Sequence, residues 1–252
     1  MNANLGMGKG TLLQAWKQSK RLAQLPIIPA SVLVPPGTRA VVIAPHPGDE
    51  ILGCGGLMQV LTRLGRPLQL ISVTDGCAAY PGSLLWPAER LSVIRPQESA
   101  EALRRLDLPL HPLKWIRGGF ADHAVAGQES ALADFLERYL RPTDVVFSSW
   151  DHDGHSDHDA VGRAAARAAA AVGARIHEVP IWAWRWAKPE DQLIPWRRAR
   201  KVLLDPISVA RKRHAAHALA SQLLGDPDAG LPATLPREVL ERLLQPFEVV
   251  FM

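Results

Sequence analysis

Two short polar segments of this sequence contain residues that commonly bind metal ions. The first holds His46 and Asp49, three residues apart, and the second holds His155 and His158, also three residues apart, just after His152. Imidazole nitrogens and carboxylate oxygens are the ligands of catalytic zinc sites, in which three protein ligands leave a coordination position for water. Histidine and aspartate in polar loops are often only solvated, so the residue types alone leave a metal site and a solvated loop equally open.

Each polar segment directly follows a run of apolar residues without polar alternation. Residues 39–44 precede the first segment and residues 144–149 precede the second. Continuous apolar runs are typical of strands that are buried on both faces of a parallel sheet. Because ligands bind beyond the carboxyl ends of such strands, we expect the two segments to face one crevice, although 112 positions separate His46 from His158.

The rest of the chain alternates between the patterns of helices and strands. Further strands are expected at residues 68–73, 113–116, 175–184 and 201–204, and helices at residues 57–64, 87–106, 128–140, 160–172 and 207–224. This alternation predicts an α/β fold with a mostly parallel sheet and helices on both of its faces. No low-complexity linker divides the chain, so we expect a single domain over residues 38–252, preceded by an N-terminal extension over residues 1–37.

The N-terminal extension carries a weak apolar pattern. Leu12, Leu13, Trp16, Leu22 and Leu25 would line one side of a short basic helix. A helix that packs on the body of a protein needs only such a stripe. We therefore favour a packed helix or a loose arm over a helix that docks on a membrane.

The composition excludes several classes of protein. Of the 252 residues, 47% are hydrophobic and 21% are charged, which is usual for a globular chain and excludes a disordered, collagen-like or coiled-coil protein. No apolar run approaches the length of a membrane span, and the N-terminus lacks the apolar core of a signal peptide. The two cysteines, Cys54 and Cys77, require no disulfide framework, so we expect a reducing, cytoplasmic environment.

A glycine-rich segment, Gly53-Cys54-Gly55-Gly56, raises the alternative of a nucleotide-binding protein. The segment lacks the Lys-Ser/Thr pair of a P-loop and the spacing of a dinucleotide fingerprint. Asp75 could serve as the acidic residue after the second strand, but His46-Pro47 occupies the place where the turn glycines would stand. The metal-site interpretation is therefore favoured over nucleotide binding.

A second alternative is nucleic-acid binding through a basic and aromatic stretch near residues 182–201. It contains four cations and four tryptophans: Arg197, Arg198, Arg200, Lys201, Trp182, Trp184, Trp186 and Trp196. Aromatic rings between cations can stack on bases. Tryptophans more often pack in a core or line a cleft, so we expect no nucleic-acid partner.

Longer stretches around both polar segments resemble the signatures of a known family. Residues 44–56 resemble the signature PHPDDExLGCGG of the PIG-L/LmbE-like family of N-acetylglucosaminyl deacetylases, and residues 153–162 resemble its HPDHxxVG signature. Shorter motifs are similar in the same order over residues 38–224: Thr74-Asp75-Gly76, Arg95 with Glu98, and His217 with Ser221-Gln222. The resemblance implies a Rossmann-like α/β domain that uses a divalent metal, usually zinc, to remove the acetyl group from an N-acetylated amino sugar.

The resemblance also implies roles for individual residues. It assigns metal binding to His46, Asp49 and His158, oxyanion stabilisation or acid catalysis to His155, the orientation of a histidine to Asp157, and substrate contact to Arg95. A carboxylate that orients a ligand histidine fixes its tautomer and raises its basicity.

One position departs from the family signature. The usual general base is the first of two adjacent aspartates, and here that position is Gly48, which cannot accept a proton. Asp151 and Asp153 are the nearest carboxylates of the second segment that could replace it as catalytic base. The other outcomes are that a metal hydroxide suffices alone, or that the chain is a catalytically weakened sugar-binding or scaffold member of the family.

The resemblance implies zinc as the cofactor, although histidine and carboxylate ligands also suit iron, cobalt or manganese. The expected partner is a small-molecule or lipid-linked N-acetyl amino sugar, and no integral membrane segment is expected. Residues 80–86 and 181–196 are the candidate segments for choosing the substrate. The sequence gives no indication of the oligomeric state.

Overall fold

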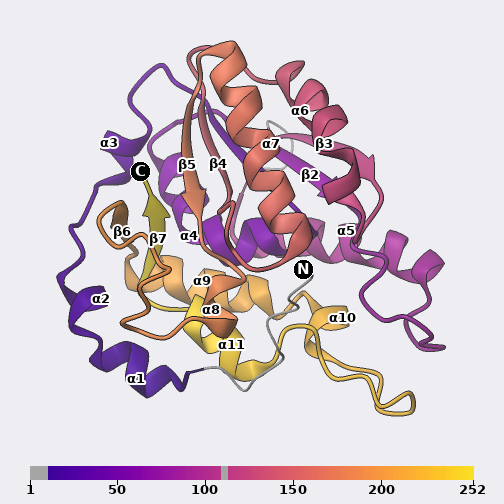
Figure 1. The fold of residues 1–252 in the computed structure, drawn as a ribbon. Helices are drawn as coiled ribbons and strands as arrows, with labels where there is room; N and C mark the ends of the chain where they lie inside the picture. Colours follow the sequence, from indigo (N-terminus) through magenta and orange to yellow (C-terminus); the bar gives the residue numbers. More distant parts are fainter. Residues whose placement is uncertain (1–10, 109–112) are drawn as a thin grey trace.

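The computed structural model describes residues 11–108 and 113–252. Seven strands form one sheet in the order β3-β2-β1-β4-β5-β7-β6 (Figure 1). Their bounds are β1 Ala40–Ala44, β2 Leu68–Thr74, β3 Lys114–Phe120, β4 Val145–Ser149, β5 Arg175–Val179, β6 Ala199–Leu203 and β7 Phe247–Phe251. Strands β1 to β5 pair in parallel, and only β7 pairs antiparallel with its neighbours β5 and β6. The α/β fold with a mostly parallel sheet is therefore confirmed.

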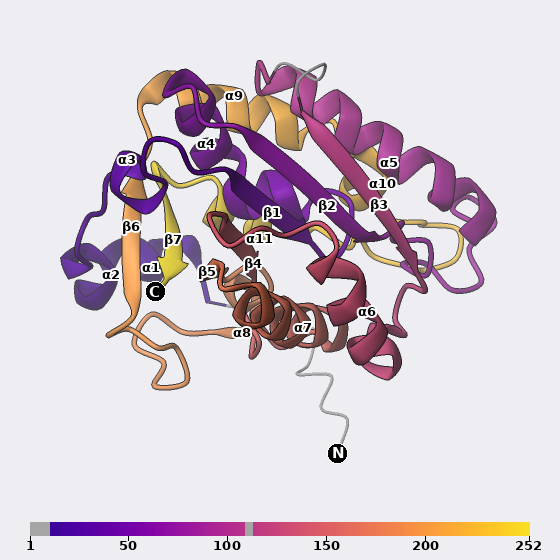
Figure 2. The same cartoon turned by 90° about the horizontal axis from the view of Figure 1, so that it is seen from above.

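Helices cover both faces of this sheet, as expected. Seen from above, α4, α5 and α9 lie on one side of the sheet, and α6 and α7 lie on the other (Figure 2). The helical bounds are α1 Leu13–Gln18, α2 Lys20–Gln24, α3 Ala30–Leu33, α4 Asp49–Arg63, α5 Ala88–Arg105, the 3-10 helix η1 Val125–Gln128, α6 Glu129–Glu137, α7 Ser156–Val172, α8 Ala183–Trp186, α9 Pro206–Ala216, α10 Ala220–Leu223 and α11 Arg237–Leu243. Among the described residues, no helix is both long and apolar enough to cross a membrane.

The central strands are buried on both faces, which explains their continuous apolar sequence. In β1, Val42 packs into the core beneath α4 and α5, whereas Val41 and Ile43 pack into the core beneath α6 and α7. Successive side chains of a strand point to opposite faces, so a strand between two helical layers needs an apolar residue at every position. The Ala-rich α7 packs tightly on this second core, with Ala164 and Ala168 fully buried.

Several elements differ from the sequence-based expectation. The strand expected at 175–184 ends at Val179, because Pro180 has no N–H for the ladder, and a short helix follows. The helix expected at 207–224 is divided into α9 and α10. The patterns did not predict α11 and β7, and β7 lies between β5 and β6 in the sheet.

The N-terminal segment packs on the body of the protein. Ser19 divides the expected helix in two, because its Oγ accepts a hydrogen bond from the backbone N–H of Leu22 and caps α2. Trp16 and Leu22 are buried, with the Trp16 ring 4.8 Å from that of Trp184, whereas Leu12 is 72% exposed. This segment therefore braces the region around α8.

Candidate metal centre

The two polar segments meet where the order of strands in the sheet reverses. β1 lies between β2 and β4, so the chain leaves β1 toward one side of the sheet and reaches the other side through β4. In open α/β sheets, a crevice forms beyond the carboxyl ends of the strands at this point. The helices α4 and α7 follow β1 and β4 and begin earlier than the sequence patterns predicted, so that Asp49 and His158 lie in their first turns.

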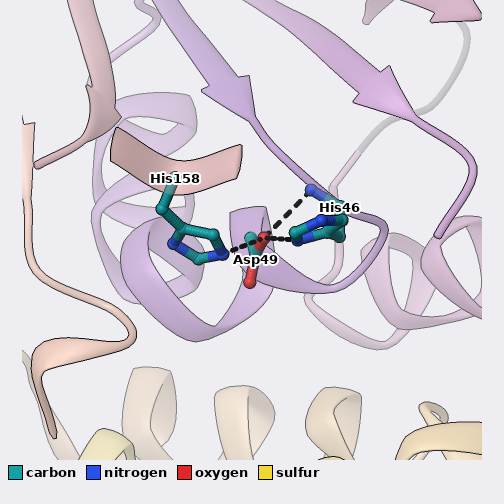
Figure 3. Close-up of side chains that lie close together, drawn as sticks. All are labelled: His46, Asp49 and His158. Carbon is teal, nitrogen blue, oxygen red and sulfur yellow. Dashed lines mark hydrogen bonds and ion pairs between the residues drawn. The ribbon is translucent and has the colours of Figure 1, made fainter. Parts of the chain in front are cut away.

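Three side chains converge in this crevice (Figure 3). One carboxylate oxygen, Asp49 Oδ2, lies 3.3 Å from His46 Nδ1 and 3.3 Å from His158 Nε2. Both imidazoles are buried, and the three donor atoms lie within 4.8 Å of one another. Two imidazole nitrogens and one carboxylate oxygen at this spacing could hold a metal ion.

The outer nitrogen of each of these two histidines is held by carboxylates. His46 Nε2 lies 3.1 Å from Asp122 Oδ1 and 3.2 Å from Asp157 Oδ2. His158 Nδ1 lies 2.8 Å from Asp153 Oδ2. Because an ionised carboxylate only accepts hydrogen bonds, each outer nitrogen carries the proton. In the neutral imidazoles the lone pairs therefore point inward, toward Asp49, as they do in histidines that bind metals.

This arrangement fits a bound cation. Without one, inward-facing lone pairs would repel the Asp49 carboxylate, unless protons lie between them. Burial lowers the pKa of His158, but the carboxylates of Asp49 and Asp153 raise it by more, so that the pKa lies at about 9. Burial raises the pKa of Asp49, yet His158 and His46 hold it well below its usual range. The carboxylates of the centre thus stabilise positive charge between these side chains, and a divalent ion would supply that charge.

His155 lies at the edge of the centre and has a defined tautomer. It is the N-cap of α7, and its Nδ1 accepts a hydrogen bond of 3.2 Å from the backbone N–H of Asp157. The neutral ring therefore carries its proton on Nε2. Its ring centroid lies 5.0 Å from that of His46 and 5.1 Å from that of His158. Burial and the charges of His158 and His46 lower the pKa of His155 to about 2, so it remains a neutral hydrogen-bond donor.

Asp153 is enclosed and does not have the surroundings of a catalytic base. The side chain is fully buried, and its carboxylate accepts hydrogen bonds from the backbone N–H groups of Ile181, Trp182 and Ala183 as well as from His158. These contacts occupy both oxygens, so no lone pair is left to take a proton from water. Asp153 instead positions His158 and the first turn of α8.

The other candidate base, Asp151, pairs with a neighbouring histidine. Its Oδ1 lies 2.6 Å from Nδ1 of His152, whose side chain is 76% exposed. Both carboxylates suggested by the sequence thus have histidine partners, His158 for Asp153 and His152 for Asp151.

Gly48, where the resembling signature has an aspartate, is closely packed. Gly48 has a φ of +103°, a conformation that side chains rarely adopt. A Cβ atom there would lie 2.7 Å from Gln222 Nε2 and 3.0 Å from Leu219 Cδ1. Gln222 Nε2 also donates a 2.8 Å hydrogen bond to the carbonyl oxygen of Pro47. Backbone conformation and packing therefore both disfavour a side chain at Gly48.

Arg95 anchors the loop that carries the first ligand. Its guanidinium is buried and donates to the carbonyl oxygens of Gly76 at 2.6 Å and Pro47 at 3.2 Å. Glu98, one turn further along α5, accepts hydrogen bonds from the backbone and hydroxyl of Ser221 at 2.7 and 2.6 Å. Both motif residues of α5 thus make contacts within the protein. The other six candidate residues lie together at the centre: His46, Asp49, Asp153, His155, Asp157 and His158.

The sequence patterns did not identify Asp122 and His123 as site residues. Asp122 contacts His46, and the backbone N–H of His123 donates to Asp157 Oδ2 at 2.7 Å. His123 has a φ of +61°, and its ring centroid lies 5.6 Å from that of His155. Both residues follow β3, so the signal that identified the other segments, a polar pair after a strand, would have found them.

Comparison with known proteins identifies a family that matches this chain. A family model described as GlcNAc-PI de-N-acetylase, PIG-L, matches residues 41–169. The chain is 30% identical over 134 residues to the Bacillus subtilis protein named "Probable N-acetyl-alpha-D-glucosaminyl L-malate deacetylase 2", a match that covers 51% of this chain and only 59% of that protein.

Solved structures show the same fold. The conserved protein TT1542 from Thermus thermophilus has 26% sequence identity and a TM-score of 0.53, over 73% of this chain and 80% of that chain. The N,N'-diacetylchitobiose deacetylase from Pyrococcus horikoshii has 20% identity and a TM-score of 0.55, over 75% of this chain and 72% of that chain.

Proposed function

The chain belongs to the PIG-L family, and from this premise we propose that it is a zinc-dependent hydrolase that removes the acetyl group from an N-acetylglucosamine unit of a small molecule or glycolipid. The observation that carries the proposal is the convergence of His46, Asp49 and His158, with the outer nitrogen of each histidine held by carboxylates. The names of the relatives support an N-acetylated amino sugar as the substrate.

We propose that His46 Nδ1, Asp49 and His158 Nε2 hold the ion. Imidazole and carboxylate donors suit zinc, and they also suit iron, cobalt or manganese. When bound, such an ion supplies Lewis acidity, which polarises the acetyl carbonyl and makes water reactive near neutral pH.

The surrounding side chains then orient the two histidines and stabilise the charge that develops on the substrate. Asp122, Asp157 and Asp153 keep the ligand histidines in the tautomers that point their lone pairs inward. His155, neutral and protonated on Nε2, donates a hydrogen bond to the oxygen that gains negative charge as the amide is attacked. No described side chain occupies the position of the usual base. A positioned base accelerates such reactions by about 10²–10⁴-fold, so we expect kcat to lack much of this acceleration.

Amine release and metal content together test the proposal. We expect the purified protein to contain a divalent metal and to release free amine from at least one of N,N'-diacetylchitobiose, an N-acetylglucosaminyl malate and N-acetylglucosaminyl phosphatidylinositol. His158→Ala should lose the metal and the activity together. His152→Ala is the matched control, because His152 belongs to the same segment but is exposed, and it should retain both.

Two results would decide against the proposal. Unchanged metal content in His158→Ala would exclude the assigned site. Full metal occupancy without amine release from any substrate would favour the second candidate function, a sugar-binding or scaffold role, which the packing of Gln222 against Gly48 supports. The cytoplasmic location suggested by the two unpaired cysteines remains part of the proposal.

A further inference from the structure

A cation without a carboxylate partner lies close to the metal centre. Arg185, in α8, places its guanidinium carbon 4.0 Å from the centroid of the Trp182 ring. Within residues 11–108 and 113–252, its side chain makes no hydrogen bond or ion pair, although most arginines of the described chain do. The stacking on Trp182 is its main contact, which leaves the edges of the guanidinium available to bind a ligand.

The surroundings of Arg185 do not neutralise it. The side chain is half-buried, and burial lowers its pKa to about 10. The charge of Asp49 opposes this shift, while the positive charge of Arg242 reinforces it. Partial burial of a charge is unfavourable unless a group of opposite charge compensates for it. The described residues supply none in contact, which points to an external anion.

Trp182 connects Arg185 to the reacting groups. Its ring centroid lies 4.8 Å from that of His155 and 6.0 Å from that of His158. Asp153 fixes this ring relative to the centre, because one carboxylate accepts the backbone N–H of Trp182 at 2.7 Å and the ring N–H of His158 at 2.8 Å.

The following residues of α8 are also held in place. The indole N–H of Trp186 donates a 2.7 Å hydrogen bond to the carbonyl oxygen of Asp153. The backbone of Gly154 lies so close to this indole that a Cβ atom would stand 2.5 Å from Trp186 Nε1. The helix turn that carries Arg185 is therefore held in place beside the centre, so the guanidinium could meet an anion at a set distance from a group that binds there.

We propose that Arg185, stacked on Trp182, binds a carboxylate or phosphate group that the substrate carries beside its N-acetylated sugar. The proposal rests on the proposed function, since it locates the anion relative to an acetyl group at the metal centre. A planar guanidinium binds both of these anions through two parallel hydrogen bonds.

Three probes of matched sugar test this subsite. N-acetylglucosaminyl malate presents carboxylates, N-acetylglucosamine 1-phosphate presents a phosphate, and methyl N-acetylglucosaminide presents no charge. We expect kcat/KM to be higher for one of the charged probes than for the neutral one. In Arg185→Gln that ratio should fall by about tenfold or more, mainly through KM, because a hydrogen bond to a charged group is lost. Arg185→Lys should lie between the two.

Arg138→Gln is the control for the loss of one positive charge. Arg138 also stacks on an aromatic ring, that of Phe135. It ends α6, which leads to the amino-terminal end of β4, whereas the centre lies beyond the carboxyl-terminal end of that strand. It should leave the charged-to-neutral ratio at the value of the unmodified chain. An unchanged ratio in Arg185→Gln, with normal turnover, would overturn the subsite and leave the proposed function intact.

Calorimetric binding of the same three probes separates the two proposals if no hydrolysis occurs. Preferential binding of a charged probe that is lost in Arg185→Gln would support the subsite while the hydrolase function fails. Equal binding of charged and neutral probes, or equal binding by the unmodified chain and Arg185→Gln, would overturn the subsite.

Discussion

On the α7 side of the candidate metal centre, His158 and Asp157 have specific polar partners, whereas on the α4 side Gly48 and packed side chains stand at the position where the signature motif has an aspartate. His158 is held by Asp153, which is held in turn by three backbone N–H groups. Gly48 faces Gln222 and Leu219 at distances that leave little space for a side chain. The three side chains proposed to bind the metal thus keep their supporting contacts although the neighbouring position carries no carboxylate.

The α7 side is tested most directly at His155. His155→Phe keeps a ring against Trp182 but removes the Nε2–H donor, so we expect kcat to fall by about 10²–10³-fold, as for other lost oxyanion donors. Metal content should stay at the level of the unmodified chain, since His155 is not one of the three proposed ligands. A variant that keeps most of its kcat would show that the charge on the oxygen is stabilised elsewhere.

A smaller effect is expected from the carboxylate behind His158. In Asp153→Asn, one acceptor oxygen is replaced by a donor that faces backbone N–H groups, so both the tautomer of His158 and the start of α8 lose support. We expect metal affinity to fall by about 10–100-fold, measured by competition with a chelator, together with a lower melting temperature. Asp134→Asn, an exposed change on α6, serves as the control and should alter neither quantity. Unaltered affinity in Asp153→Asn would remove the contrast between the two sides.

The smallest effect is expected on the α4 side, where restoring the family residue meets the packing. Gly48→Asp should lower stability by about 1–3 kcal/mol, because it combines an unfavourable φ with overpacking, and it should not speed turnover. The double variant Gly48→Asp, Gln222→Ala removes the closest contact, and we expect it to regain part of the stability. Its kcat should rise by about tenfold, a fraction of what a well-placed base contributes.

Thermal unfolding and amine release measure both quantities, with Gln222→Ala alone as the control. A Gly48→Asp variant that is as stable as the unmodified chain and also faster would show that packing does not close this position.

Apolar patterning and the positions of polar residues predicted much of this molecule. The uninterrupted apolar runs before His46 and before residue 150 indicated two central strands, and the positions of the polar residues after them indicated a shared crevice. Periodicity reports burial but not direction, so it could not predict that β7 would enter the sheet antiparallel between β5 and β6. The close packing around Gly48 could not be predicted either, because it depends on Gln222, which lies far along the chain.

The double duty of Asp153 has a practical consequence for protein engineering. Ile181, Trp182 and Ala183 bind its carboxylate through main-chain N–H groups, so these three bonds do not depend on which side chains the residues carry, whereas Trp186 is attached through its indole. Substitutions at residues 181–183 should therefore be tolerated if the backbone still presents three amide protons to that one acid. Libraries that diversify the stretch and leave residue 153 untouched would explore new specificities without dismantling the ligand beside it.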